Sequence, residues 1–150
     1  MDRDLEKADL LDLTGEAYAA LNRRDFDALL AMFGPASVWD VSRWGLGTHA
    51  GLDSIHHLMD DWFGSLDDYE VQIEEMTDLG NGVVALVVTQ VARLKGGGAM
   101  RVRSAPVFVW SGTTIASVTL YPDIEEGRAA AAQAAGLPAA PRSEPELRST

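Results

Sequence analysis

The spacing of apolar residues changes once along this chain, and that change constrains the fold more than any other feature. In the first half, apolar side chains recur every three or four residues, which is the period of an amphipathic helix. In the second half they alternate with polar residues, which is the period of a β-strand. A chain of 150 residues has room for one domain and one core. The sequence therefore predicts a single α+β domain in which helices precede a sheet.

Three helices are expected before the sheet. The first covers about residues 4–22, and the second covers residues 26–33, where Gly34 and Pro35 would end it. The third covers residues 53–66 and has the clearest amphipathic pattern in the chain. All three have an apolar stripe that must be buried against another element.

A short β-prone segment at residues 36–41 and a glycine-punctuated loop at residues 42–51 separate the second helix from the third. Three turns then divide the second half into a meander of four long antiparallel strands, and they fall at residues 81–82, 96–98 and 111–113. Helices over a curved sheet enclose a concave, mostly apolar space, which is the default place for a small ligand.

The C-terminal part carries weaker signals. Residues 128–135 are rich in alanine and lack bulky apolar side chains, so a weakly packed helix is expected there. Residues 137–150 are rich in proline and charge and are expected to be a disordered tail. The predicted domain therefore spans residues 1–136.

Composition excludes several functions. The chain has no cysteine, which removes disulfides, cysteine-bound zinc and thiol nucleophiles. A net charge of −11 with scattered basic residues argues against nucleic-acid binding. No apolar run reaches the length of a membrane span, and the acidic start lacks the features of a secretory signal. We expect a cytoplasmic protein without a membrane partner, and the preference for arginine, alanine and glycine suggests a bacterial source.

Four segments carry a resemblance to a known family. Residues 18–29 (YAALNRRDFDAL) contain an Asn-x-x-Asp step between two helices, residues 38–55 contain a strand, a loop and a helix start, and residues 111–121 and 134–137 form the closing hairpin and the ending. Over residues 8–137 the chain resembles the SnoaL-like branch of the NTF2-like (ketosteroid isomerase-like) superfamily. The resemblance implies an NTF2-like cone: three N-terminal helices packed on a curved antiparallel sheet.

Asp40 is the first candidate for catalysis. It ends an apolar strand, and strand alternation places it on the face opposite Trp39. If that face lines the pocket, desolvation would raise the pKa of the carboxyl toward the range of a general base. The resemblance to ketosteroid isomerases implies this role. In the alternative interpretation, Asp40 caps a turn or pairs with Arg43, and both interpretations stay open.

The other members of the family's catalytic sets are incomplete. The resemblance implies a tyrosine on the first helix and a protonated acid on a late strand as oxyanion donors; Tyr18 is one residue out of register and Pro106 occupies the acid's place. The hydrolase branch uses an Asp-Arg-Asp trio, whereas Arg101 and Arg103 have no acid within the last two strands. Polyketide cyclases use a late-strand acid, and Asp123 lies just past the last strand.

Aromatic and histidine side chains are the candidates for ligand contact. Trp44 is a large residue in the loop after Asp40, where it would close over a ligand or a partner subunit. His49, in the same loop, is either a proton carrier at the pocket mouth or a surface histidine. The predicted ligand-binding set is Tyr18, Trp44, His49, Trp62, Phe108 and Tyr121.

Several polar side chains complete the candidates. Ser104, Ser117, Thr119 and Gln90 lie on predicted strands and are suited to orient a ligand, although the pattern does not say which of them face inward. His56 and His57 are adjacent on a helix and do not share a face, so no metal site is expected.

Two functions follow from these residues. The first is a cofactor-independent isomerase, cyclase or hydrolase that acts on an apolar carbonyl or epoxide compound with Asp40 as general base. The second is a non-catalytic ligand carrier or a dimeric accessory protein, because the remaining catalytic groups are missing. The resemblance also implies a homodimer formed through the open face of the sheet.

Overall fold

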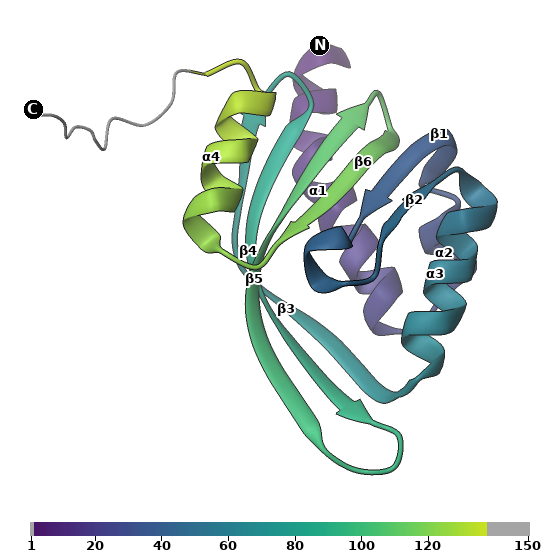
Figure 1. Ribbon diagram of the computed structural model, residues 1–150. Coiled ribbons are helices and arrows are strands. Elements are labelled where there is room, and N and C mark those ends of the chain that lie inside the picture. Colours follow the sequence, from purple (N-terminus) through teal and green to yellow (C-terminus); the bar gives the residue numbers. More distant parts are fainter. Residues whose placement is uncertain (1, 138–150) are drawn as a thin grey trace, which may run out of the picture.

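The computed structural model describes residues 2–137 of the chain, and side-chain environments from residue 10 onward. The tail predicted for residues 137–150 lies, except for Leu137, outside the described residues. One sheet forms the centre, and helices pack on both of its faces (Figure 1). The helices are α1 (Asp2–Asn22), α2 (Phe26–Leu30), η1 (Ser42–Trp44, a 3₁₀ turn), α3 (Leu52–Gly64) and α4 (Ile124–Ala134).

The sheet has six strands in the order β2-β1-β6-β5-β4-β3. The strands are β1 (Phe33–Asp40), β2 (Thr48–Ala50), β3 (Leu66–Gly80), β4 (Val83–Leu94), β5 (Ala99–Ser111) and β6 (Thr114–Tyr121). The predicted meander of four long antiparallel strands is confirmed as β3 to β6. The sheet is mixed rather than purely antiparallel, because β1 pairs with β6 in parallel.

The junction of α2 and β1 differs from the prediction. The helix ends at Leu30 instead of residue 33, and Phe33 already belongs to β1. The Phe33 ring stacks on Trp39 at 5.6 Å between centroids, so burial in the core draws this residue out of the helix. Pro35 is tolerated inside the strand because the pairing with β6 is irregular between Phe33 and Val38, where no ladder needs its missing N–H group.

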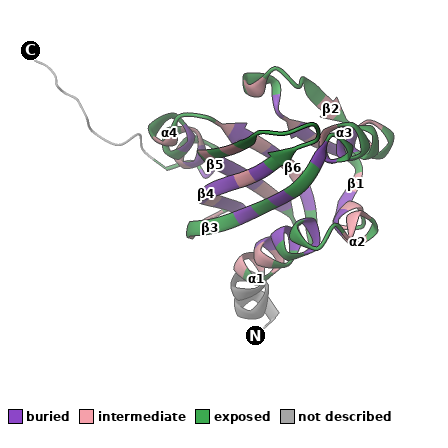
Figure 2. Cartoon of the chain, turned by 90° about the horizontal axis from the view of Figure 1, so that it is seen from below, coloured by how far each residue is buried: buried purple, intermediate pink, exposed green. Residues whose placement is uncertain are grey.

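The two faces of the sheet differ in their cover. The inner face carries Val88, Phe108 and Val118, and α1 and α3 pack against it to form the main core. The outer face carries Val83 and Val107, which belong to a smaller core under α4. Figure 2 shows buried residues along the sheet and on the side of α1 that faces it. Apolar strands with alternating side chains therefore fill two separate layers.

The Asn-x-x-Asp step joins the helices to the edge of the sheet. The Asn22 side chain donates to the Val71 carbonyl (3.0 Å) and accepts from the Val71 N–H (2.8 Å). Asp25 caps α2 by accepting from the Ala28 N–H at 3.1 Å. Between them, Arg24 adopts a left-handed conformation (φ 60°) and donates to the carbonyls of the turn between α3 and β3. The step thus fixes both helices to β3.

Helix α4 packs closely on the outer face, whereas the sequence predicted weak packing. It begins at Ile124, and Asp123 caps it by accepting from the N–H groups of Glu125 and Glu126. Ala131 is fully buried against the small outer core. The lack of bulky side chains, from which weak packing was predicted, is what allows α4 to approach the strands closely. Gly127 lies directly on Ala105.

We expect Gly127→Ala to destabilise the fold by about 1–3 kcal/mol, since overpacking at a closed contact forces the backbone apart. An added Cβ would lie 2.5 Å from the Ala105 Cβ and 3.0 Å from the Ala105 carbonyl oxygen. Gly15→Ala in α1 is the matched control, because no atom lies within 4 Å of its added Cβ. This control should gain up to about 1 kcal/mol from helix propensity. Urea unfolding of both variants measures the difference, and equal stabilities would contradict the close packing of α4.

Candidate functional site

The alternation of β1 separates the two residues at its end. Trp39 pairs with Val118 and Asp40 with Thr119 on β6. Val118 belongs to the main core on the inner face, whereas Thr119 lies beside Val107 on the outer face. The sequence correctly placed Asp40 opposite Trp39, and the structure adds that the interior is the side of Trp39. The Asp40 carboxylate is therefore directed away from the main core.

Asp40 holds the turn that follows β1. Its Oδ1 accepts from the Ser42 N–H (3.0 Å), the Ser42 hydroxyl (2.6 Å) and the Thr48 hydroxyl (3.1 Å). Arg43 Nη1 lies 3.7 Å from Asp40 Oδ2, and the Asp40 side chain is 25% exposed. The hydrogen bond from the Ser42 side chain is the main reason that the pKa of Asp40 is lowered from its ordinary value, with Thr48 and Arg43 acting in the same direction. The raised pKa expected for a pocket-facing carboxyl is thus not found, because the charged form is hydrogen-bonded and partly solvated.

Tyr121 also faces outward. The Arg43 guanidinium lies over its ring at 4.5 Å from the centroid, and Arg43 Nε is 3.6 Å from Glu126 on α4. Together these residues tie the loop after β1 to the last strand and to α4. Tyr121 therefore lies on the opposite face of the sheet from the other aromatic candidates.

Both ring nitrogens of His49 are engaged. Nε2 lies 2.8 Å from the Leu46 carbonyl, and Nδ1 lies 3.0 Å from the Ser54 hydroxyl. A neutral imidazole satisfies both contacts by donating to the carbonyl and accepting from the hydroxyl. His49 thus links the glycine-rich loop to the start of α3. Among the side chains of residues 10–137, no three histidine or acidic groups cluster as a metal would require.

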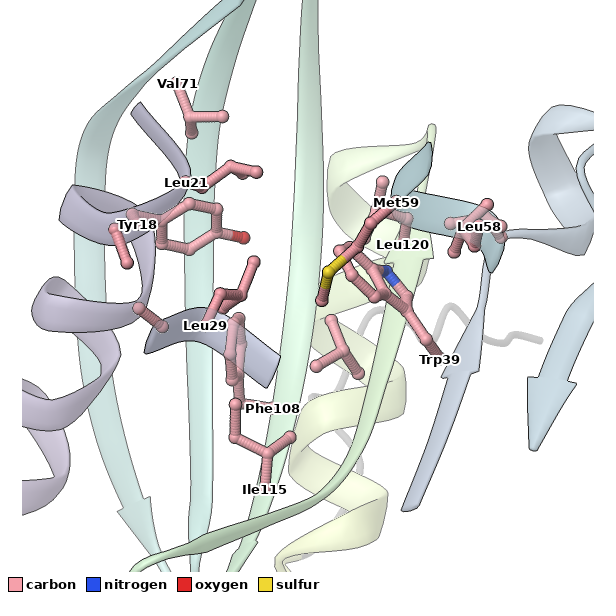
Figure 3. Packing of buried hydrophobic residues seen from close by; sticks show 14 of the residues in the cluster. Tyr18, Leu21, Leu29, Trp39, Leu58, Met59, Val71, Phe108, Ile115 and Leu120 are labelled. Atoms are coloured by element: carbon pink, nitrogen blue, oxygen red, sulfur yellow. The ribbon is translucent and has the colours of Figure 1, made fainter. Parts of the chain in front are cut away.

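Four of the predicted ligand-binding residues belong to the main core or pack against it: Tyr18, Trp44, Trp62 and Phe108. Tyr18 and Phe108 form an edge-to-face pair at 5.6 Å, and Trp62 lies 6.5 Å from Trp39 between ring centroids. Trp44 is half-buried and packs against the same cluster. Figure 3 shows Tyr18 reaching into this cluster from α1, with its hydroxyl directed toward the side occupied by Met59 and Trp39.

The interior also contains a chain of polar side chains that the sequence did not reveal as a unit. The Tyr69 hydroxyl donates to Gln90 Oε1 at 2.7 Å, and Gln90 Nε2 donates to Ser104 Oγ at 2.9 Å. The three residues come from β3, β4 and β5 and are all buried. Burial raises the pKa of Tyr69 and of Tyr18, so both phenols stay neutral. Gln90 and Ser104 were visible as polar interruptions, but only the strand register brings them to one face.

Within residues 10–137, two indole N–H groups lack acceptors. The Nε1 atoms of Trp39 and Trp44 are buried without a hydrogen-bond partner, whereas Nε1 of Trp110 donates to Thr14 Oγ1 at 3.0 Å. Buried donors without acceptors are uncommon and call for an explanation. Among residues 10–137, the buried polar side chains are all uncharged: Thr14, Ser37, Thr89, Gln90 and Ser104.

The concave space expected from the sequence is occupied by side chains such as Ile55, Met59 and Phe63, each less than 2% exposed. A surface hollow of about 250 Å³ lies instead on the outer face, between α4, β3 and β4. Its walls are mostly apolar, and the ion pair of Arg128 with Glu75 (2.9 Å) stands beside it. The interior therefore needs a local rearrangement before it can admit a ligand.

Comparison with known proteins gives the family. The SnoaL-like domain family matches residues 15–118, which is more than half of the chain, so the protein belongs to the SnoaL-like domain family. A search of curated proteins found no match. None of the helices within residues 2–137 is long and apolar enough to span a bilayer.

Solved structures of other proteins share the fold of this chain. An NTF2-like protein of unknown function from Burkholderia pseudomallei is 19% identical, with a TM-score of 0.68 over 78% of this chain and 92% of that chain. A putative polyketide cyclase from Sinorhizobium meliloti is 20% identical, with a TM-score of 0.63 over 76% and 97%. A Mycobacterium tuberculosis protein in complex with estradiol-17β-hemisuccinate is 15% identical, with a TM-score of 0.65 over 74% and 91%. The predicted NTF2-like fold is thus confirmed.

The environment of Asp40 makes stability depend on pH. Because its pKa is lower in the folded chain, the carboxylate stabilises the fold above its ordinary pKa of 3.8, and this contribution is lost as the pH falls through the folded value. We expect Asp40→Asn to be less stable than the natural chain at pH 7, by on the order of 1 kcal/mol or less for a partly exposed group. The difference should shrink on acidification, as thermal unfolding between pH 7 and pH 3 would measure.

Ser42→Ala is the companion variant. It removes the largest cause of the lowered pKa, so the midpoint of the pH dependence should move upward. A difference between Asp40→Asn and the natural chain that widens on acidification would mean that the carboxyl has a raised pKa and would support the general-base interpretation.

Proposed function

We propose that this protein binds a small, largely apolar molecule between α1, α3 and the inner face of the sheet, and that it acts as a ligand carrier or accessory protein. The observation that carries this proposal is the Tyr69–Gln90–Ser104 chain on the inner face. A few convergent polar groups in an otherwise apolar, aromatic enclosure are the composition of a small-molecule site.

The margin of the interior supports an entry route. Trp44, Trp62 and Met100 are half-buried and pack against the main core from η1, α3 and β5. A ligand that reached Gln90 would displace such side chains and take over their contacts with the core. Half-buried side chains of this kind, and the flexible methionine in particular, can reorient without breaking a helix or a strand.

The relatives agree with an apolar ligand. The Mycobacterium tuberculosis structure was crystallised with estradiol-17β-hemisuccinate, whose ring system is largely apolar. At 15% identity this similarity shows a shared fold, and the ligand class of this chain is part of our proposal.

Catalysis with Asp40 as the general base stays a prediction. The lowered pKa and the three donors at Oδ1 argue for a structural role. Dimerisation through the outer face also stays a prediction, and it must take account of α4, which lies over β4, β5 and β6 on that face.

Ligand-induced stabilisation tests the proposal. A panel of neutral, apolar, carbonyl-containing polyketide-like compounds should include binders that raise the melting temperature. A ligand at 100 times its Kd adds about 2.7 kcal/mol, which corresponds to roughly 5–10 °C for a chain of this size. A panel that leaves the melting temperature unchanged would argue against a ligand-binding role.

Two serine variants locate the site. Ser104→Ala removes the end of the inner polar chain and should weaken binding several-fold, since a hydrogen bond contributes about 1 kcal/mol. Ser117→Ala is the matched control, because Ser117 pairs with Val109 on the outer face and should leave the Kd unchanged. The opposite ranking would move the site to the outer face.

A further inference from the structure

We infer that the ligand is uncharged and rich in hydrogen-bond acceptors, and that Trp39 and Trp44 determine this specificity by donating their indole N–H groups to it. The inference rests on the proposed function and names the class of ligand for the same interior. It starts from the direction of the hydrogen bonds that the interior leaves open.

The two buried side-chain atoms that lack a hydrogen-bond partner among residues 10–137 are both donors. Nε1 of Trp39 and Nε1 of Trp44 are buried without an acceptor. The polar chain runs in one direction: Tyr69 donates to Gln90 and Gln90 donates to Ser104, which leaves the Ser104 hydroxyl hydrogen free to donate. A carbonyl or ether oxygen on a ligand would satisfy such groups, whereas a hydroxyl or amine hydrogen would find few acceptors.

The burial of Trp39 means that its indole N–H requires an acceptor from the ligand itself. Trp39 is only 6% exposed and belongs to the main core, so bulk solvent does not reach its indole N–H. Figure 3 shows its indole directed into the core near Met59 and Leu120, both apolar side chains. A buried donor without an acceptor destabilises the structure, and an acceptor on the ligand would remove that cost.

The charge of the interior limits the ligand further. None of the buried polar side chains in residues 10–137 is ionised, and the raised pKa of Tyr18 and of Tyr69 keeps these phenols neutral. A carboxylate drawn into this space would lose its hydration without gaining a cation. Neutral ketones, quinones and lactones are therefore favoured over acids and amines.

Three compounds with one flat skeleton test the inference: 9-fluorenone, fluorene, and fluorene-9-carboxylate. We expect fluorenone to bind at least about tenfold more tightly than fluorene, because it alone adds a neutral acceptor. The carboxylate should bind most weakly at pH 7. Thermal shift titrations give the three affinities.

The indole signals in a ¹H–¹⁵N spectrum report on the donors directly. Fluorenone should shift the N–H signals of Trp39 and Trp44 downfield as they acquire an acceptor. The signal of Trp110 is the internal control, since its N–H already donates to Thr14. Trp39→Phe and Trp44→Phe assign the signals and should reduce the preference for fluorenone, while Trp62→Phe, which keeps both donors, should preserve it.

The outcomes separate the two proposals. If fluorene binds as tightly as fluorenone and both indole signals stay in place, the inferred specificity is wrong while the binding function stands. If none of the three compounds binds, the ligand-binding function and the specificity both fail.

Discussion

The whole structure depends on the alternation of side chains across one sheet that carries helices on both faces. Helices α1 and α3 pack on the inner face and α4 packs on the outer face, so the buried apolar residues of the strands divide into two separate layers. Moving one residue along β1 leads from the Trp39 side to the Asp40 side. Chemistry in the interior must therefore use groups that share the face of Trp39.

Most of the fold could be predicted because it follows from local signals. The change of apolar period separated helices from strands, and glycine-containing turns divided the meander. The junction at Phe33 and the start of α4 at Ile124 were missed, because distant contacts decide them: stacking on Trp39 in one case and the approach of Gly127 to Ala105 in the other. The parallel pairing of β1 with β6 is likewise a long-range choice.

The candidate site was harder to predict. Alternation separated Asp40 from Trp39, but both faces of the late strands are apolar: Phe108 points inward and Val107 outward. No pattern in the sequence says which of these layers is the interior. Gln90 and Ser104 are 14 residues apart and become neighbours only through the register of β4 and β5. The site thus depends on information that exists only once the sheet is assembled.

The two hydrogen bonds between Asn22 and Val71 affect how readily this protein associates with other chains. Strand β3 ends the sheet, so its free backbone groups are a template to which a foreign strand can be added. The Asn22 side-chain amide occupies both the N–H and the carbonyl of Val71, so these two groups are not available to an added strand. The segment that joins the first two helices thereby also disfavours edge-to-edge association of the sheet.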